Sequence, residues 1–339
     1  MITISQNSQI LSKDRETLKN WMGRSAVIEP LPGDASSRRY YRIKTKIDSF
    51  VAMKLQPFRD LADQLPFLQV QRHLAKLKVN VPQIVDADSG KGLILLSDLG
   101  DETLLKRLEK VSKIRDQLVW FKQAIDLLLQ MQISATKTSA PIDAYGLYFD
   151  EEKLMWEVAF TFAHFYGGYL ARNIPNSELR VLEAYFQWIC KQLSSQEWYF
   201  THRDYHSRNI MVYGGELYMI DFQDARLGCA QYDLASLLRD AYYQLDEDVV
   251  YELVEYYLKQ KEKLEHKKEN AAEFIRIFDL MSIQRNFKAI GSFASFYTKK
   301  NDVRYLKFIG NTFENIRRNL LKFPELDELR CLLFRYYYF

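Results

Sequence analysis

Hydrophobic spacing changes character about one third of the way along the chain. Before residue 97, short apolar runs bounded by turn residues indicate strands, and two segments have helical spacing. We expect helices at 11–22 and 61–77 and strands at 39–43, 50–55, 80–85 and 92–96. After residue 101 helical periodicity dominates, with helices expected at 103–108, 112–133, 151–170, 177–193 and from 232 to the end.

This change predicts an α+β protein with two lobes. The small N-terminal lobe, 1–96, combines an antiparallel sheet with a helix, and the larger C-terminal lobe, 102–339, is mostly helical. Residues 97–101 are expected to form the hinge between them. The length of 339 residues fits two domains or one bilobal unit.

One stretch of the helical part, residues 197–227, has short β-like runs broken by polar residues. In it, Asp204 is followed five residues later by Asn209, and Asp221 follows after twelve more. Two apolar runs around the pair Gly214-Gly215 predict a β-hairpin, because glycine adopts the positive φ that a tight hairpin turn needs. The hairpin is expected to bring the side chains of Asn209 and Asp221 together.

These residue types suit phosphoryl transfer from a nucleoside triphosphate. Asn209 and Asp221 supply an amide oxygen and a carboxylate, ligands that suit the Mg²⁺ needed to neutralise phosphate charge. Asp204, just upstream, is placed to accept the proton of an acceptor hydroxyl. The order His-x-Asp-x-x-x-x-Asn, hairpin, Ile-Asp-Phe is typical of the kinase fold. Polar residues that merely cap turns would not explain this order.

Composition and charge exclude several other classes. The 47 basic and 44 acidic residues give a net charge of +3, too balanced to indicate a nucleic-acid or membrane partner. No apolar run of about 18 residues indicates a transmembrane helix, and the N-terminal residues lack a signal-peptide pattern. The three cysteines have the spacing of neither a disulfide framework nor a zinc site. We therefore expect a cytoplasmic protein, and its oligomeric state stays open.

The motifs at 202–209 (HRDYHSRN) and 220–225 (IDFQDA) resemble the aminoglycoside phosphotransferase/choline kinase group, whose members share the protein-kinase fold. Segments 33–42 (GDASSRRYYR), 93–100 (LILLSDLG) and 283–291 (IQRNFKAIG) are similar to the sugar kinases that phosphorylate N-acetylmuramate and N-acetylglucosamine at the anomeric carbon. The resemblance implies ATP as the phosphate donor, Mg²⁺ as the metal, and an amino sugar as the acceptor. The 1-phosphate of that amino sugar would enter cell-wall recycling.

Four residues are expected to contact the nucleotide. Lys54 stands where the kinase fold places a phosphate-contacting lysine, although the helix at 61–77 offers no glutamate partner, and a surface position is the alternative. Ser36 and Ser37 are expected to form an anion-binding nest with neighbouring N–H groups. Asp98 lies in the expected hinge.

The candidates for contact with the acceptor are Glu157, Arg208, Asp224 and Arg285. Gln284, Arg285 and Lys288 form one polar face of a late helix, and the guanidinium suits an acceptor carboxylate. His202 is expected to order the catalytic loop by hydrogen bonds, and Asp233 to brace it. A structural or surface role is the alternative for each acceptor candidate.

Two other functions stay open. An aminoglycoside- or choline-type kinase would act on a different hydroxyl, but a polycationic acceptor needs an acidic cleft, and no dense acidic cluster stands out. A pseudokinase would bind nucleotide without turnover. It would have no chemical need for Asp204, Asn209 and Asp221 together.

Overall fold

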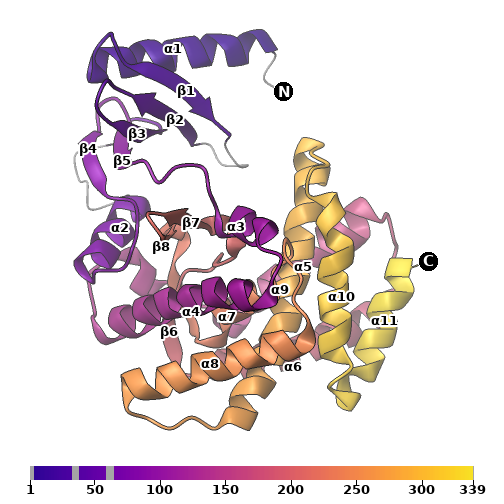
Figure 1. Cartoon of the computed structure of the whole chain (residues 1–339). Coiled ribbons are helices and arrows are strands. Elements are labelled where there is room, and N and C mark those ends of the chain that lie inside the picture. The colour runs from indigo at the N-terminus through magenta and orange to yellow at the C-terminus, as the bar shows by residue number, and fades with distance from the viewer. Residues whose placement is uncertain (1–3, 33–37, 59–64, 339) are drawn as a thin grey trace.

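The computed structural model describes residues 4–32, 38–58 and 65–338. A part that contains a five-stranded sheet joins a larger helical part (Figure 1). The elements of the first part are α1 (Ile4–Met22), β1 (Val27–Leu31), β2 (Arg39–Lys44), β3 (Ser49–Lys54), α2 (Pro66–Lys76), β4 (Ile84–Asp88) and β5 (Leu93–Ser97). The helices of the second part are α3 (Leu104–Lys110), α4 (Ile114–Lys137), α5 (Glu151–Thr161), α6 (Asn176–Ser194), α7 (Gln231–Leu238), α8 (Glu247–Glu265), α9 (Ala271–Lys300), α10 (Ile309–Leu320) and α11 (Asp327–Tyr338). Its strands are β6 (Trp198–Thr201), β7 (Ile210–Tyr213), β8 (Glu216–Met219) and β9 (Arg226–Cys229). The expected fold class is confirmed.

The N-terminal sheet is antiparallel throughout, with strand order β1-β2-β3-β5-β4. The sequence pattern missed β1, because Pro30 and the turn residues after it interrupt the strand signal. β1 lies at the edge of the sheet, where the missing N–H of proline is tolerated. β4 begins at Ile84 and not at residue 80, because the carbonyl of Asn80 accepts a hydrogen bond from Met219 of β8 (3.0 Å).

Two apolar layers cover the two faces of this sheet, because successive side chains of a strand point to opposite faces. On one face, Tyr41 and Ala52 pack in a small cluster with Leu18 of α1. On the other, Met53 and Ile94 belong to the main core, which continues into the helical part. The helix α1 therefore covers the face that is turned away from the helical part (Figure 1).

Arg42 of β2 fixes the segment that connects β5 to α3. Its guanidinium donates hydrogen bonds to Asp98 (Nε–Oδ2, 2.7 Å), Asp101 (Nη1–Oδ1, 2.7 Å) and the carbonyl of Gly100 (3.0 Å). The hydroxyl of Ser49 donates a further bond to Asp98 (2.6 Å). We call Arg42, Ser49, Asp98 and Asp101 the hinge clamp. Where the lobes divide stays a prediction.

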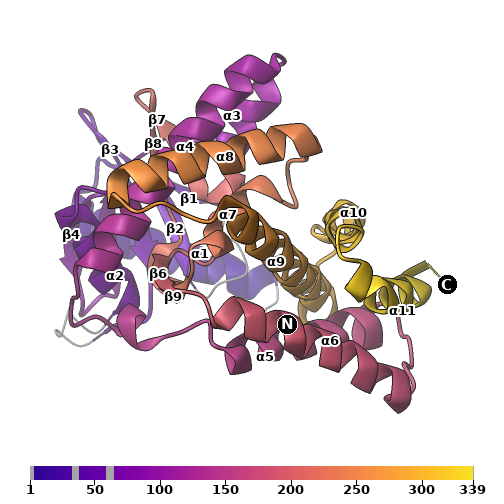
Figure 2. The same ribbon diagram turned by 90° about the horizontal axis from the view of Figure 1, so that it is seen from below.

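The 30-residue helix α9 runs through the middle of the helical part (Figure 2). It packs against α5, α7 and α10. It packs tightly on α5 at Gly291, where a Cβ atom would lie only 2.7 Å from the Cα atom of Thr161. The hydroxyl of Thr161 donates to the carbonyl of Phe287 (3.0 Å), so α5 and α9 are held at a fixed separation.

The predicted helices differ from the observed ones mainly at their ends. The first helix begins at Ile4, earlier than expected, and α2 begins at Pro66, while 61–64 lie outside the described residues. The segment expected as one helix over 151–170 is α5 followed by a π-helix, Phe162–Tyr169. Within the described ranges, no helix has both the length and the apolar character that crossing a membrane requires.

Candidate active site

The loop that carries Asp204 follows β6 and is braced from below by α7. The carboxylate of Asp233 accepts hydrogen bonds from the backbone N–H groups of His202 (2.6 Å) and Arg203 (3.0 Å). The ring of His202 contacts the carbonyl of Ile220 through Nε2 (2.9 Å), and burial lowers its pKa to about 4. His202 is therefore neutral near pH 7 and orders the loop, as the sequence predicted, and Asp233 braces it.

The predicted hairpin is present and has the predicted turn. Strands β7 and β8 pair in antiparallel register from Ile210↔Met219 to Tyr213↔Glu216. Gly214 and Gly215 both have positive φ (60° and 85°), which identifies a type I′ turn. At the open end, the N–H of Ile220 donates to the carbonyl of Asn209 (2.9 Å). Asn209 and Asp221 therefore lie on neighbouring strand ends.

The two side chains fit a divalent cation. Asn209 donates through Nδ2 to the backbone carbonyl of Asp204 (3.0 Å), which leaves its Oδ1 atom available as a ligand. The carboxylate of Asp221 accepts a bond from Gln223 (2.8 Å), but it has no ion pair among the described residues. Desolvation by the surrounding protein and the nearby charges of Asp204 and Asp224 raise the pKa of Asp221. A cation beside Asp221 would stabilise the charged carboxylate and lower its pKa.

Within the described part of the chain, no group of three or more His, Cys, Asp and Glu side chains forms a metal cluster. A site with only Asn209 and Asp221 suits Mg²⁺, which commonly keeps several waters and takes one or two protein ligands together with phosphate oxygens. Asp221 itself has a left-handed backbone (φ 67°), an uncommon conformation for a residue other than glycine. Such backbone strain gathers at functional sites.

Asp204 lies next to this pair and is surrounded by cations. Its Oδ1 atom accepts bonds from Lys288 (Nζ, 3.0 Å) and Arg285 (Nη2, 3.4 Å), both from α9. Although burial favours the neutral acid, the charges of Lys288, Arg203 and Arg285 hold the pKa of Asp204 well below its usual range. Asp204 is therefore a carboxylate at neutral pH.

Beside Asp204, several buried polar atoms have no partner. Oε1 of Glu157, Oε1 of Gln284 and the hydroxyl of Tyr232 all lack a hydrogen bond within the described residues, and all three residues are buried. The second oxygen of Glu157 accepts a bond from Gln284 (3.2 Å), which ties α5 to α9. Buried polar groups are normally satisfied, so these three atoms are an uncommon feature of the interior next to Asp204.

The other predicted acceptor contacts are dispersed. Arg285 reaches Asp204 and also donates to Ser236 (2.9 Å). Asp224 pairs with Arg203 (3.1 Å) and is half exposed. The guanidinium of Arg208 stacks on Tyr242, 4.7 Å from the ring centre. The structure thus brings Arg285 into contact with Asp204, whereas Asp224 pairs with Arg203 and Arg208 stacks on Tyr242.

Of the predicted nucleotide contacts, Lys54 and Asp98 have other partners in the structure. Lys54 lies on the α1 face of the sheet, opposite Arg39 in register, and donates to the carbonyl of Lys91. The carboxylate of Asp98 is occupied by the hinge clamp. Ser36 and Ser37 lie outside the described residues. Arg38, by contrast, is close enough for its charge to lower the pKa of Asp221.

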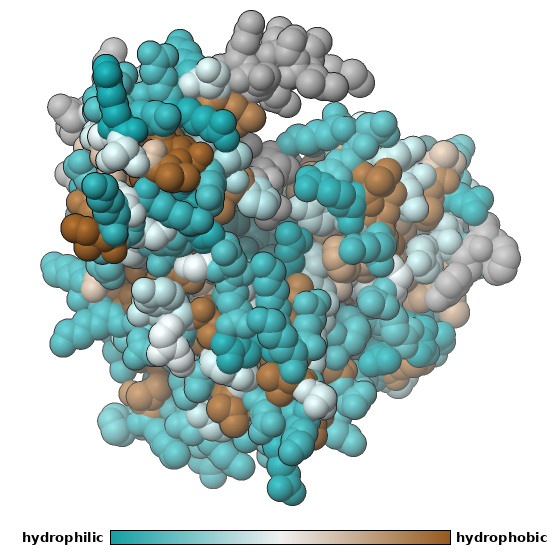
Figure 3. All heavy atoms as spheres, turned by 45° about the horizontal axis from the view of Figure 1, so that its top comes forward, coloured by the Kyte–Doolittle hydropathy of each residue, from teal (hydrophilic) through white to brown (hydrophobic). Residues whose placement is uncertain are grey.

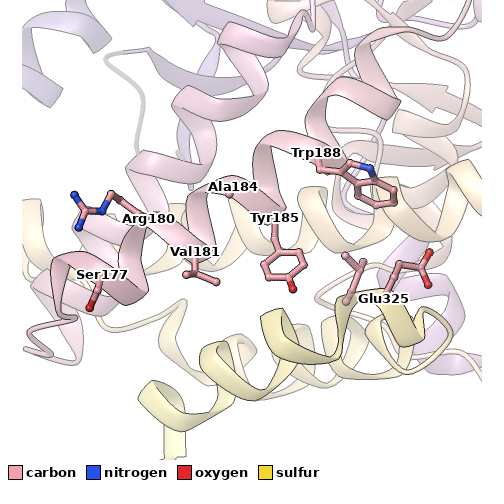
Figure 4. A pocket seen from close by; sticks show the side chains of 8 residues that line it. Ser177, Arg180, Val181, Ala184, Tyr185, Trp188 and Glu325 are labelled. Carbon is pink, nitrogen blue, oxygen red and sulfur yellow. The ribbon is translucent and has the colours of Figure 1, made fainter.

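The space-filling view shows a hollow near the middle of one face, bordered largely by hydrophilic residues (Figure 3). A different hollow, of about 710 Å³, lies between α6 and the short helix Pro324–Leu326. Val181, Tyr185 and Trp188 line it, and Figure 4 shows its open, largely apolar wall. It contains none of the predicted catalytic or metal-binding residues, so we do not place the active site there.

Chemically, the site combines a carboxylate that faces a polar space with two oxygen ligands for a cation. This arrangement suits the transfer of a phosphoryl group to a hydroxyl. Sequence reasoning had placed Lys288 on a polar helix face but had not selected it. The signal was its spacing of three residues from Arg285, which puts both side chains on one side of α9.

Comparison with known proteins agrees with this geometry. The family model described as "Phosphotransferase enzyme family" matches residues 27–274. An N-acetylmuramate/N-acetylglucosamine kinase of Neisseria meningitidis is 30% identical over 93% of this chain and 94% of its own length. The enzyme of the same name from Pseudomonas aeruginosa is 33% identical over 91% of this chain and 88% of its own.

Solved structures show the same fold at low identity. A microcompartment-associated aminopropanol kinase has a TM-score of 0.65 at 14% identity and covers 94% of this chain and 99% of its own. An ADP-bound aminoglycoside phosphotransferase has a TM-score of 0.61 at 14% identity, with 89% and 96% coverage. From the family match and from relatives at 30% identity or more across most of both chains, we conclude that this chain belongs to the phosphotransferase enzyme family.

Proposed function

We propose that this protein is an ATP- and Mg²⁺-dependent kinase that phosphorylates the anomeric hydroxyl of N-acetylmuramate or N-acetylglucosamine. The observation that carries the proposal is the grouping of Asp204 with Asn209 and Asp221 at the open end of the β7–β8 hairpin. The names of the relatives supply the acceptor. The 1-phosphate product would serve cell-wall recycling, and the use of ATP places the reaction in the cytoplasm.

In this mechanism each of the three residues has one task. Asn209 and Asp221 would hold Mg²⁺, which neutralises charge on the transferred phosphate when it is bound. Asp204 orients the acceptor hydroxyl and takes its proton as the new bond to phosphorus forms. Because its pKa is held low, we expect Asp204 to accept the proton late, when the hydroxyl has become strongly acidic.

For the nucleotide we propose a revised set of contacts. Asp98 supports the hinge through Arg42, so the hinge would present backbone groups to the base. Arg38, directly before β2, replaces Lys54 as the proposed cation for the phosphates, because its charge acts on Asp221 whereas Lys54 lies on the α1 face of the sheet. Ser36 and Ser37 remain proposed phosphate contacts from the sequence.

The charges around Asp204 favour a neutral or acidic acceptor. Lys288, Arg285 and Arg203 all act on this carboxylate. An aminoglycoside or choline carries positive charge and would be repelled by them, whereas an uncharged or anionic sugar would not be. Glu157 stays a proposed acceptor contact from the sequence, and its bond to Gln284 holds it between α5 and α9.

The proposal is tested by an acceptor screen with ATP and Mg²⁺, in which NMR identifies the phosphorylated carbon. We expect Asp204→Asn to lower kcat about 10²- to 10⁴-fold, and Asp221→Ala to weaken binding of Mg-ATP by at least roughly tenfold. The exposed Asp248 of α8 gives the control variant, Asp248→Asn, which should behave as the wild type. Phosphorylation of choline or aminoglycosides, with the two sugars left unchanged, would contradict the proposal.

A further inference from the structure

One feature of the site remains unused by the proposed reaction: two cations of α9 share a single oxygen of Asp204. Lys288 lies 3.0 Å and Arg285 3.4 Å from Oδ1. Oδ2 of the same carboxylate has no hydrogen bond within the described residues. We call Lys288 and Arg285 the cationic fork.

The fork distinguishes two otherwise equivalent oxygens. The terminal torsion of an aspartate is broad and nearly two-fold, so a free carboxylate exchanges its oxygens between two directions. Two donors on Oδ1 remove this freedom. They leave Oδ2 as the atom available to an acceptor hydroxyl.

Lys288 and Arg285 are not equivalent within the fork. Arg285 is also anchored by the hydroxyl of Ser236 (2.9 Å). The ammonium of Lys288, in a residue that is only 9% exposed, has Asp204 as its hydrogen-bond partner among the described residues. Burying a lysine is unfavourable unless its charge is paired, so its place at this oxygen calls for a function.

The backbone around Lys288 is also fixed. Three residues further along α9, Gly291 meets Thr161, and Thr161 bonds the carbonyl of Phe287. These contacts set the height of Lys288 relative to α5 and to the loop of Asp204. A small displacement of a catalytic group changes rates strongly, by as much as about 10²-fold for 1 Å.

We propose that Lys288 is a positioning residue for phosphoryl transfer, which with Arg285 holds Oδ1 of Asp204 and leaves Oδ2 for the acceptor hydroxyl. The inference rests on the proposed function for the identity of the acceptor. A positioning role affects both sugars. A role in binding the acceptor's carboxylate would instead affect N-acetylmuramate and not N-acetylglucosamine.

The test compares Lys288→Met and Lys288→Arg with the wild type, using both sugars. The control is Lys299→Met, which removes an exposed lysine of the same helix. We expect Lys288→Met to lower kcat about 10²-fold for both sugars, with KM for ATP and for each sugar within about threefold of wild type. Lys288→Arg should restore kcat to within about tenfold of wild type, because a guanidinium also pairs with a carboxylate.

Three outcomes would overturn the proposal. A rise in KM for N-acetylmuramate alone, at unchanged kcat, would make Lys288 an acceptor-binding group. Equal losses in kcat and in ATP binding, without rescue by arginine, would indicate a structural role. Wild-type kcat in Lys288→Met would show that the fork has no role in transfer.

A second measurement does not depend on turnover. Asp204→Asn leaves the Lys288 ammonium buried without its counter-charge, so its Tm should fall, and Asp204→Asn/Lys288→Met should recover much of the loss. Additive changes in Tm would refute the pairing on which the proposal stands. If the wild type phosphorylates neither sugar, the proposed function fails. The comparison of the single and double variants still decides whether the cationic fork holds Asp204.

Discussion

Replacing Gly291 by alanine tests whether the separation of α5 and α9 is set by close packing. The added Cβ would lie 2.3 Å from Oγ1 and 2.7 Å from Cα of Thr161, so a backbone has to move. Overpacking of this kind costs about 1–3 kcal/mol, and the displaced Thr161 hydroxyl would lose a bond worth about 1 kcal/mol. The better helix propensity of alanine offsets roughly 1 kcal/mol of this loss in the free energy of unfolding. We therefore expect a net loss of about 1–3 kcal/mol.

Gly310 of α10 is the matched control. It is also a helical glycine, but the nearest atom to a Cβ there is the hydroxyl of Tyr337 at 3.8 Å. Gly310→Ala should therefore stabilise the protein by about 0.5–1 kcal/mol. Urea unfolding of both variants measures the difference. Equal stability of Gly291→Ala and Gly310→Ala would refute the packing argument.

The same variant affects activity through the side chains that the two helices carry. Glu157 belongs to α5, and Lys288 belongs to α9. When the helices separate, both move relative to Asp204. We expect a lower kcat/KM for the acceptor in Gly291→Ala and wild-type values in Gly310→Ala.

Two further predictions concern the hinge clamp and the catalytic loop. Arg42→Met leaves the buried Asp98 without its counter-charge, so it should lower the free energy of unfolding by about 3–5 kcal/mol and raise KM for ATP. The control Lys44→Met breaks only the exposed pair with Glu29 and should lower the free energy of unfolding by at most about 1 kcal/mol. Urea unfolding and ATP kinetics measure these effects, and similar losses in the two variants would contradict the clamp. Burial lowers the pKa of His202 to about 4, whereas the unfolded chain titrates near pH 6.5, so the unfolded state takes up this proton first as the pH falls. The contribution of His202 to the free energy of unfolding is thus complete above about pH 6.5 and falls by up to about 3 kcal/mol on going to pH 4. If the stability of His202→Gln has the same slope against pH as the wild type in this range, the group responsible lies elsewhere.

The parts of the site that depend on local sequence were predicted well. The hairpin at Gly214-Gly215 and the neighbouring ends at Asn209 and Asp221 follow from thirteen consecutive residues. Turn chemistry and strand alternation are local properties, so the sequence of this segment is enough to predict where such an element turns. Asp233 was also placed correctly, because its helix follows the same stretch directly.

The sheet shows where local reasoning stops. Lys54 was assigned to the nucleotide by its position after an apolar strand, but the face on which it lies depends on which layer covers which side of the sheet. That choice is made by α1, whose packing the sequence pattern did not reveal. A shift of one residue in strand alternation exchanges the two faces, so resemblance in sequence alone does not fix the direction of the side chain.

The sequence did not predict the contact between the cationic fork and Asp204, for a different reason. Lys288 and Asp204 are 84 residues apart, and their contact depends on how α9 packs beneath the catalytic loop. The polar face of α9 was visible, but not the carboxylate that it meets. Tertiary packing supplies this information, and no periodicity in a single helix contains it.

The bond between Asn80 and Met219 has a consequence for the order of events in a catalytic cycle. The side chain of Asn80 also donates to the carbonyl of Leu217 (3.1 Å), and Phe67 of α2 stacks on Phe222, with ring centres 5.1 Å apart. The segment before β4 is therefore tied to the hairpin whose ends carry Asn209 and Asp221. Organisation of these two proposed metal ligands belongs to folding itself, so we expect an arriving nucleotide to meet a preassembled pair that need not form anew in each turnover.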